Sequence, residues 1–170
     1  AASDVYKRQA KYIGAEMVGL ETCRFSDDDE INNSEETYQY LLKNMKKLVS
    51  AAEEIGVNVG IEGVHFHVIN TPTKMKRLVD DLNSPNVRVI FDPVNYINTA
   101  NYKNQDEIIN THFDLLGEKT KLLHLKDFKL VDGEVAYEFP CDGLLNKDLL
   151  WDKLKQYNPC LLYTSPSPRD

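Results

Sequence analysis

The sequence lacks any long apolar run, and it has only three cysteines and one tryptophan among its 170 residues. No apolar stretch approaches the roughly 18 residues that a membrane helix needs, and no charged start followed by an apolar core marks a signal peptide. Cys23, Cys141 and Cys160 are odd in number and form no C-x-x-C pair, which disfavours both a disulfide framework and a thiolate zinc site. We therefore expect reduced structural thiols in a cytoplasmic protein with no membrane partner.

Positive charge is also scarce. The chain carries 20 Lys and Arg against 27 Asp and Glu, a formal net charge of -7, which argues against nucleic acid as a partner. A hydrophobic content of 42% with 28% charged residues is typical of a globular domain and unlike a disordered chain.

The two ends of the sequence differ from the rest. Residues 1–9 and 160–170 resemble the translation of sequencing-library adapter, as found at the ends of assembled reads. We expect both to be non-native tails and residues 10–159 to form the native domain, truncated on both sides. A native flexible tail rich in Ser and Pro is the alternative.

Between these ends, strand and helix patterns alternate. Short apolar stretches predict strands over residues 15–23, 57–64, 87–91 and 121–125. Apolar residues at steps of three and four predict helices over residues 38–55, 72–82, 108–116 and 147–157. This alternation predicts an α/β fold with a parallel sheet covered by helices. A doubly wound sheet and a barrel both fit, but no G-x-G-x-x-G follows a strand, which weakens the dinucleotide-binding version.

Individual residues predict where these helices begin and end and which side chains face inward. Asn33 and Glu36 predict a capping box before the first helix and Gly56 its end. Thr71-Pro72 predicts the start of the second helix. His112 is expected to face solvent on the third. On the last helix, capped by Asn146, we expect Leu150, Trp151 and Leu154 to face inward.

Three potential metal ligands fall at the ends of consecutive strands. Glu62 ends one strand, Asp92 directly follows the next, and His124 lies late in the third. Carboxyl ends of parallel strands meet at one edge, where α/β enzymes keep their active sites. Two carboxylates and an imidazole suit Mn, Mg, Co or Zn, although a solvated glutamate and a core histidine are the alternatives for single residues.

The same residues belong to a set of short motifs that resembles the sugar phosphate isomerase/epimerase family of xylose-isomerase-like TIM barrels. The motifs are Gly60-Ile61-Glu62, Thr71-Pro72, Ser84-Pro85-Asn86-Val87, Phe91-Asp92-Pro93-Val94-Asn95 and Leu123-His124-Leu125-Lys126-Asp127. The resemblance implies a partial (β/α)8 TIM barrel, roughly strands four to seven with their helices. It also implies that Glu62, Asp92 and His124 are metal ligands. A fourth ligand, a second Glu, would lie beyond Pro159.

Other residues near these motifs are candidate substrate contacts. Many epimerases of the family carry His where this chain has Asn95, which weakens an assignment to the ketose 3-epimerases. His65 and His67 share a face if their segment is extended, and His67 is then a substrate contact. Lys126 is expected to neutralise an anionic or oxyanionic substrate group. Asp127 either braces the junction of strand and loop or meets substrate.

The resemblance implies a divalent-metal-dependent isomerase or epimerase of carbohydrate metabolism, acting on a sugar or sugar phosphate. Proton transfer α to a carbonyl would pass through an enediolate, with Glu62 as one half of the acid/base pair. The parent protein is compatible with a homo-oligomer. Because the other half of the pair is absent, we expect this fragment to be inactive.

Three other functions are alternatives to an isomerase or epimerase. A dehydratase acting on a keto-inositol uses similar metal geometry. A catalytically inactive barrel is the second. A class II apurinic endonuclease would need further metal ligands, including His in place of Asn95, and a basic groove, whereas the central segment has three arginines, Arg24, Arg77 and Arg88.

Overall fold

The computed structural model describes residues 8–157 and 159–163. Five strands in this part of the chain form one parallel sheet in the order β1-β2-β3-β4-β7. Their bounds are β1 Met17–Glu21, β2 Asn58–Glu62, β3 Val87–Phe91, β4 Thr120–Leu125 and β7 Cys160–Tyr163. Strands that follow each other along the sequence are therefore neighbours in the sheet, as the alternating pattern predicts.

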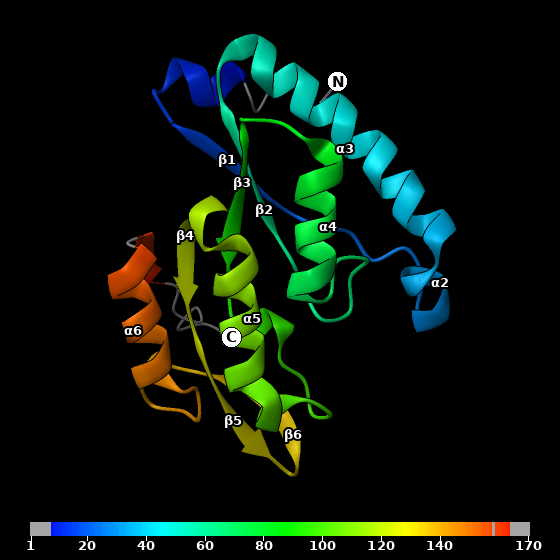
Figure 1. Ribbon diagram of the computed structural model, residues 1–170. Helices are drawn as coiled ribbons and strands as arrows, with labels where there is room; N and C mark the ends of the chain where they lie inside the picture. Colours follow the sequence, from blue (N-terminus) through cyan, green and yellow to red (C-terminus); the bar gives the residue numbers. More distant parts are fainter. Residues whose placement is uncertain (1–7, 158, 164–170) are drawn as a thin grey trace.

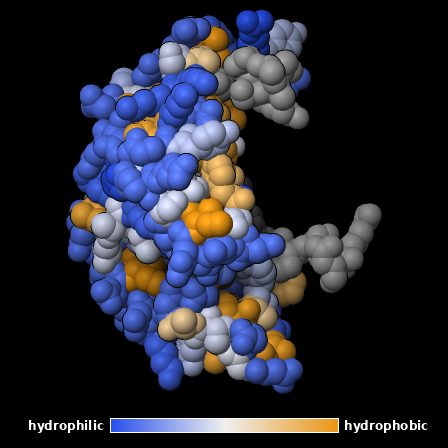
Figure 2. Space-filling view, turned by 90° about the vertical axis from the view of Figure 1, so that its right-hand side faces the viewer, coloured by the Kyte–Doolittle hydropathy of each residue, from blue (hydrophilic) through white to orange (hydrophobic). Residues whose placement is uncertain are grey.

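The main helices lie on one side of this sheet (Figure 1). They are α3 Glu35–Ile55, α4 Pro72–Leu82, α5 Gln105–Leu116 and α6 Lys147–Tyr157. The other side of the sheet is not covered in the same way, and Figure 2 shows the molecule from the side as a curved shell with a hollow along one edge. This curvature, with helices outside and an inner face that none of the helices α3 to α6 covers, is that of a piece of a barrel.

The alternation of side chains along each strand separates the core from the inner face. In β2, Val59 and Ile61 are buried among residues of α3 and α4. Glu62, one position further, points to the opposite face because successive side chains of a strand alternate. A second apolar cluster joins β3 and β4 to α5 and α6 through Phe91, Phe113 and neighbouring residues.

Sequence-based boundaries hold for most helices, with one correction at α3. Ser34 is its N-cap, and its Oγ accepts a hydrogen bond from Thr37 N, so the predicted box of Asn33 and Glu36 is wrong. The reason is that the short helix α2 (Asp29–Asn33) keeps Asn33 in a helical turn, and the chain becomes extended only at Ser34. Gly56 ends α3 in the left-handed conformation at φ 71°, as predicted.

The caps of α4 and α6 also agree with the sequence pattern. Thr71 accepts a hydrogen bond from Lys74 N, with Pro72 at the first helical position. Asn146 Oδ1 accepts one from Leu149 N at the start of α6. Both predicted starts are therefore confirmed.

A β-hairpin after β4 was not predicted. Strands β5 (Asp127–Val131) and β6 (Glu134–Glu138) pair antiparallel as a separate two-stranded sheet. Asp132 and Gly133 form the turn with φ values of 52° and 87°. An Asp-Gly pair between apolar residues is the usual sequence mark of such a turn, so the information was present in the sequence.

Two expectations about side chains are wrong. His112 is fully buried, stacked on Phe91 at a ring distance of 3.6 Å, because it shares the inner face of α5 with Ile109, Phe113 and Leu116. Trp151 is 37% exposed. The face of α6 that packs on the core is centred on Leu150, which is 1% exposed, and the adjacent residue Trp151 lies about 100° around the helix from it.

Other expectations concern the thiols, the membrane and the tails. All three cysteines are free, as expected, but they are exposed and therefore not part of the core. Within the described residues, no helix has the length and apolar character needed to cross a bilayer. Residues 1–7 and 164–170 of the predicted tails lie outside the described residues, and the tail assignment stays a prediction.

Candidate metal centre

Three neighbouring parallel strands bring Glu62, Asp92 and His124 together at their carboxyl ends. Glu62 is the last residue of β2, Asp92 directly follows β3, and His124 is the second-last residue of β4. One potential ligand atom from each lies within 4.8 Å of the other two. The proximity expected from the spacing is thus present, while the metal-binding role stays a prediction.

The charges at this cluster are unbalanced. Glu62 is 6% exposed and Asp92 is 0% exposed. Burial raises the pKa of Asp92, and the nearby Lys126 ammonium opposes that effect. The hydrogen bond from His124 Nδ1 to Glu62 Oε1, 3.2 Å long, raises the pKa of the imidazole, while burial opposes the rise. Two buried carboxylates therefore share one permanent cation, an arrangement that suits an additional positive ion.

Asn95 and Lys126 connect the two carboxylates. Asn95 Nδ2 donates to Glu62 Oε1 at 2.7 Å, and its Oδ1 accepts from Lys126 Nζ at 3.2 Å. Lys126 Nζ also lies 2.8 Å from Asp92 Oδ2. Asp92 Oδ1 accepts hydrogen bonds from the backbone N–H groups of Val94 and Asn95 at the start of the 3₁₀ turn η1 (Val94–Tyr96). The predicted substrate contacts Asn95 and Lys126 are therefore in direct contact with the candidate metal ligands.

His65 and His67 lie in a turn after β2, so the expectation that they share a face of an extended segment is wrong. The backbone N–H of His67 donates to Val64 O, which closes the turn. His67 is 9% exposed, its Nδ1 has no hydrogen-bond partner in the described residues, and burial lowers its pKa. It makes no hydrogen bond to the three candidate ligands among the described contacts, and its contact with substrate stays a prediction.

Asp127 braces the junction of strand and loop. Its side chain is fully buried, and its oxygens accept hydrogen bonds from the backbone N–H groups of Phe128, Gly143 and Leu145. Of the two roles considered for this residue, the structure supports the bracing one.

Sequence analysis missed two tyrosines near the cluster. Tyr96 is 1% exposed, and burial, with smaller contributions from the charges of Glu62 and Asp92, raises its pKa. Tyr137 of β6 has its ring centroid 5.3 Å from Lys126 Nζ. Tyr96 directly follows Asn95 in the sequence and could have been found there, whereas Tyr137 depends on the hairpin that was not predicted.

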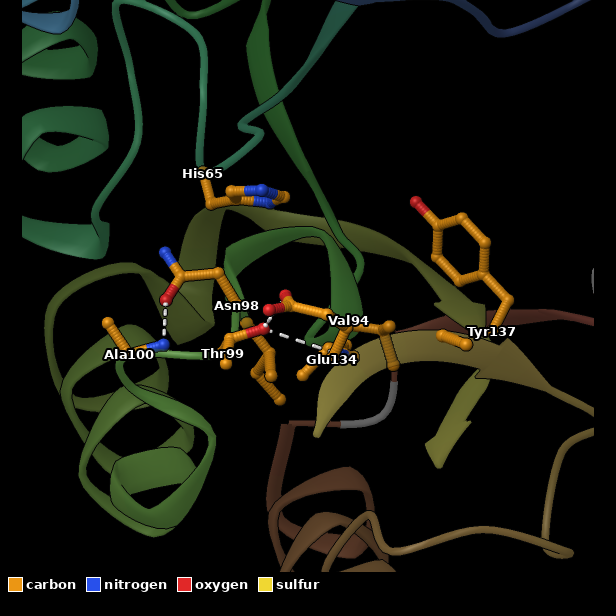
Figure 3. Close-up of a pocket in the computed structure, with 10 residues that line it drawn as sticks. His65, Val94, Asn98, Thr99, Ala100, Glu134 and Tyr137 are labelled. Atoms are coloured by element: carbon orange, nitrogen blue, oxygen red, sulfur yellow. Dashed lines mark hydrogen bonds between the residues drawn. The ribbon is translucent and has the colours of Figure 1, made fainter. Parts of the chain in front are cut away.

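A cavity of about 510 Å³ lies between the loop before α5 and the β5–β6 hairpin (Figure 3). It is lined by His65, by Val94 and residues 97–100 before α5, and by residues 134–137 of β6. His65 N donates to Asn95 O at 2.7 Å, and Tyr137 contacts Lys126, so the lining touches the two residues that hydrogen-bond or pair with the candidate ligands.

The sequence model of the xylose isomerase-like TIM barrel family matches residues 8–162. The chain belongs to this family. The parallel sheet with helices on one side is accordingly a partial TIM barrel, as the motifs predict. A search of curated proteins found no match.

Solved structures of xylose isomerase-like barrels and related proteins share this fold. A D-tagatose 3-epimerase-like protein is 18% identical, with a TM-score of 0.74 over 94% of this chain and 59% of its own. The "probable 3-DHS dehydratase AsbF" of Bacillus anthracis is 10% identical, with a TM-score of 0.79 over 99% of this chain and 64% of its own. A xylose isomerase-like TIM barrel protein from Mycobacterium smegmatis in complex with magnesium is 13% identical, with a TM-score of 0.73 over 99% and 60%. The chain thus spans about three fifths of the length of these relatives.

Proposed function

We propose that this chain carries most of the metal centre of an isomerase or epimerase that moves a proton α to the carbonyl of a sugar or sugar phosphate. The observation that carries the proposal is the cluster of Glu62, Asp92 and His124, with ligand atoms within 4.8 Å of one another. The cluster lies at the carboxyl edge of a parallel sheet, where barrel enzymes hold their catalytic groups.

The donor set fits a divalent cation. Two buried carboxylates and one imidazole with a single nearby ammonium leave a net negative site, and Mg, Mn, Co and Zn all accept such oxygen and nitrogen ligands. When bound, such an ion supplies Lewis-acid polarisation of a carbonyl and a neighbouring hydroxyl.

The residues around the cluster have distinct proposed tasks. Glu62 is the proposed proton-transfer group, and the hydrogen bonds from Asn95 and His124 hold its carboxylate in one orientation. Lys126 provides positive charge beside the substrate's developing negative charge, and Asn95 fixes the position of that ammonium. His67, with its unpartnered and buried Nδ1, is the proposed further substrate contact.

A second candidate reaction is dehydration of a keto-polyol of the inositol type. Asn95 favours it, because many epimerases of the family carry His at that position. An epimerase-like protein and a dehydratase share this fold with the chain at identities of 18% and 10%, which indicate the fold alone and do not choose between the two reactions.

Metal binding tests the proposal directly. Isothermal titration of the purified chain with Mn²⁺ should show one site for the wild type and none for Asp92→Asn, which keeps the shape of the side chain. Asp142→Asn, in an exposed turn, is the matched control and should bind as the wild type does. Absence of binding by the wild type, or unchanged binding by Asp92→Asn, would refute the proposed site. Exchange of the α proton of keto sugars in D₂O, followed by NMR with the longer parent protein, then tests the reaction.

A further inference from the structure

The cavity beside the candidate metal centre has a definite chemical character. Its lining combines apolar residues such as Val94 and Ile97 with a few polar groups, as in sites for small molecules. In Figure 3 the His65 ring lies at one end of the cavity, Thr99 and Glu134 lie on its floor, and Tyr137 stands at the other end.

The cavity has few groups that could bind an anion. None of the ten described residues that line it is Lys or Arg, whereas Glu134 contributes a carboxylate. Lys126, which lies against Tyr137 of the lining, is paired with Asp92 and Asn95. Lys129 of the hairpin is paired with Glu138 at 2.7 Å. A phosphate group in this cavity would therefore meet the Glu134 carboxylate without a Lys or Arg among the described lining residues.

Backbone donors bind phosphate in many loops, and several of those around this cavity are occupied by side chains. Ala100 N and Asn101 N both donate to Asn98 Oδ1, at 2.9 and 3.1 Å. Asn98 N donates to Asn101 Oδ1 at 2.7 Å, and Val135 N donates to Thr99 Oγ1 at 3.3 Å. Three N–H groups of the loop before α5, those of Asn98, Ala100 and Asn101, are thus bonded to side chains of the same loop.

Hydrogen-bond acceptors, in contrast, remain available. The partner of His65 Nδ1 is the carbonyl oxygen of Asn95, 3.3 Å away, so Nδ1 carries the proton and Nε2 is an acceptor. Glu134 Oε2 accepts from Thr99 Oγ1 at 2.6 Å, which fixes the carboxylate and leaves Oε1 without a donor among the described residues. Acceptors of this kind pair with hydroxyl groups, which donate.

Tyr137 adds a flat apolar surface. Its side chain is among the exposed large hydrophobic residues, at 57%, and it stands between the cavity and Lys126. An aromatic face at the edge of a polar cavity suits the C–H face of a sugar.

We propose that this cavity binds the uncharged, hydroxylated end of the substrate, so that the enzyme acts on a free keto sugar and discriminates against its terminal phosphate ester. The inference rests on the proposed function, because it assigns the substrate class of the same site. It narrows the choice between sugar and sugar phosphate that the sequence leaves open.

The test compares D-fructose with D-fructose 6-phosphate as probes, in ligand-observed NMR titrations of the full chain with Mg²⁺ present. D-Fructose should bind up to about fivefold more tightly, the effect of one partly exposed charge. Glu134→Lys, which reverses the charge of the cavity, should remove or invert that preference. Glu54→Lys makes the same change on an exposed position near the end of α3 and should leave the preference unchanged.

Equal or tighter binding of the phosphate ester by the wild type would overturn the inference, and so would a preference that Glu134→Lys does not alter. Failure to bind either probe would also overturn it. The Mn²⁺ titration of wild type and Asp92→Asn is independent of this cavity, so loss of the proposed metal site would be seen separately from loss of the sugar preference.

Discussion

Lys126 Nζ lies 2.8 Å from Asp92 Oδ2, the carboxylate oxygen that the backbone leaves free. Asp92 Oδ1 is already held by two N–H groups of the following turn. A cation that binds Asp92 through Oδ2 must therefore share that oxygen with an ammonium or displace it.

Removal of this ammonium should strengthen metal binding. We expect Lys126→Met to raise the Mn²⁺ affinity about tenfold, because the competing ion pair and the repulsion between two cations are both lost. Isothermal titration measures the change. Lys129→Met, which breaks the ion pair with Glu138 on the hairpin, is the control and should leave the affinity unchanged. A weaker affinity in Lys126→Met would mean that Lys126 supports the cation.

His112 should make stability depend on pH. Thr120 Oγ1 donates to Leu116 O, so His112 Nε2–H donates to Thr120, and the buried Nδ1 has no partner in the described residues. Burial lowers the pKa of His112 to about 3. The unfolded state, with a pKa of about 6.5, binds the proton first as pH falls, so stability decreases below about pH 6.5 and continues to decrease toward pH 3.

The effect can be isolated with His112→Phe, which keeps an aromatic ring beside Phe91. The free energy of unfolding of the wild type should fall by up to about 1.4 kcal/mol per pH unit more steeply than that of the variant below about pH 6. Urea unfolding at pH 7, 6 and 5 measures both slopes. Parallel slopes would show that His112 is protonated in the folded state.

The same histidine shows where sequence reasoning stops. The strand and helix order, the caps at Thr71 and Asn146, and the proximity of the candidate ligands follow from local periodicity and from parallel pairing. The expectation that His112 faces solvent is wrong, although its spacing from Ile109 and Leu116 is compatible with the inner face of α5. Burial of a single polar residue depends on what packs against the helix, which periodicity does not report.

The residues around the candidate site are harder to predict from the sequence than its three candidate ligands. Glu62, Asp92 and His124 are found from their positions at strand ends, whereas the Lys126–Asp92 ion pair depends on side-chain conformations after β4. The hairpin that supplies Glu134 and Tyr137 has an Asp-Gly turn in the sequence, but the packing of that hairpin against the loop before α5 is a long-range contact.

Gly63 and Tyr96 pack without room for a side chain. A Cβ at Gly63 would overlap the Tyr96 hydroxyl and come within 2.8 Å of Ile69 O. We expect Gly63→Ala to lower the free energy of unfolding by about 1–3 kcal/mol and to weaken Mn²⁺ binding, because the strain falls next to Glu62. Thermal unfolding and Mn²⁺ titration measure the two effects.

Tyr96→Phe provides the matched comparison. Its hydroxyl has no hydrogen-bond partner among the described residues, so this change alone should cost little stability. Combined with Gly63→Ala, it should restore part of the lost stability, the remainder being the contacts of the new Cβ with the ring carbon Cζ at position 96, 2.6 Å away, and with Ile69 O. Additive effects of the two substitutions would argue against a direct clash.

Asp127 should be sensitive to loss of a single acceptor oxygen. Asp127→Asn replaces one carboxylate oxygen by an amide nitrogen that faces N–H groups of the backbone, so we expect a loss of about 2 kcal/mol. Asp132→Asn, in the exposed hairpin turn with positive φ, should be nearly neutral because Asn tolerates that conformation. Chemical unfolding of the two variants gives the comparison, and equal losses would contradict the bracing role.

Glu62, Asp92 and His124 lie about thirty residues apart in the chain and come from three successive strand–helix units. Crossover connections that contain a helix commonly join parallel strands in this way. An ion held by all three side chains would act as a reversible cross-link between those units. Folding and ion binding would then be linked equilibria, so that the melting temperature rises with the free concentration of the ion. Unfolding of one unit would release the ion and destabilise the other two. The ion would thereby couple β2 to β4, two strands that are not neighbours in the curved sheet.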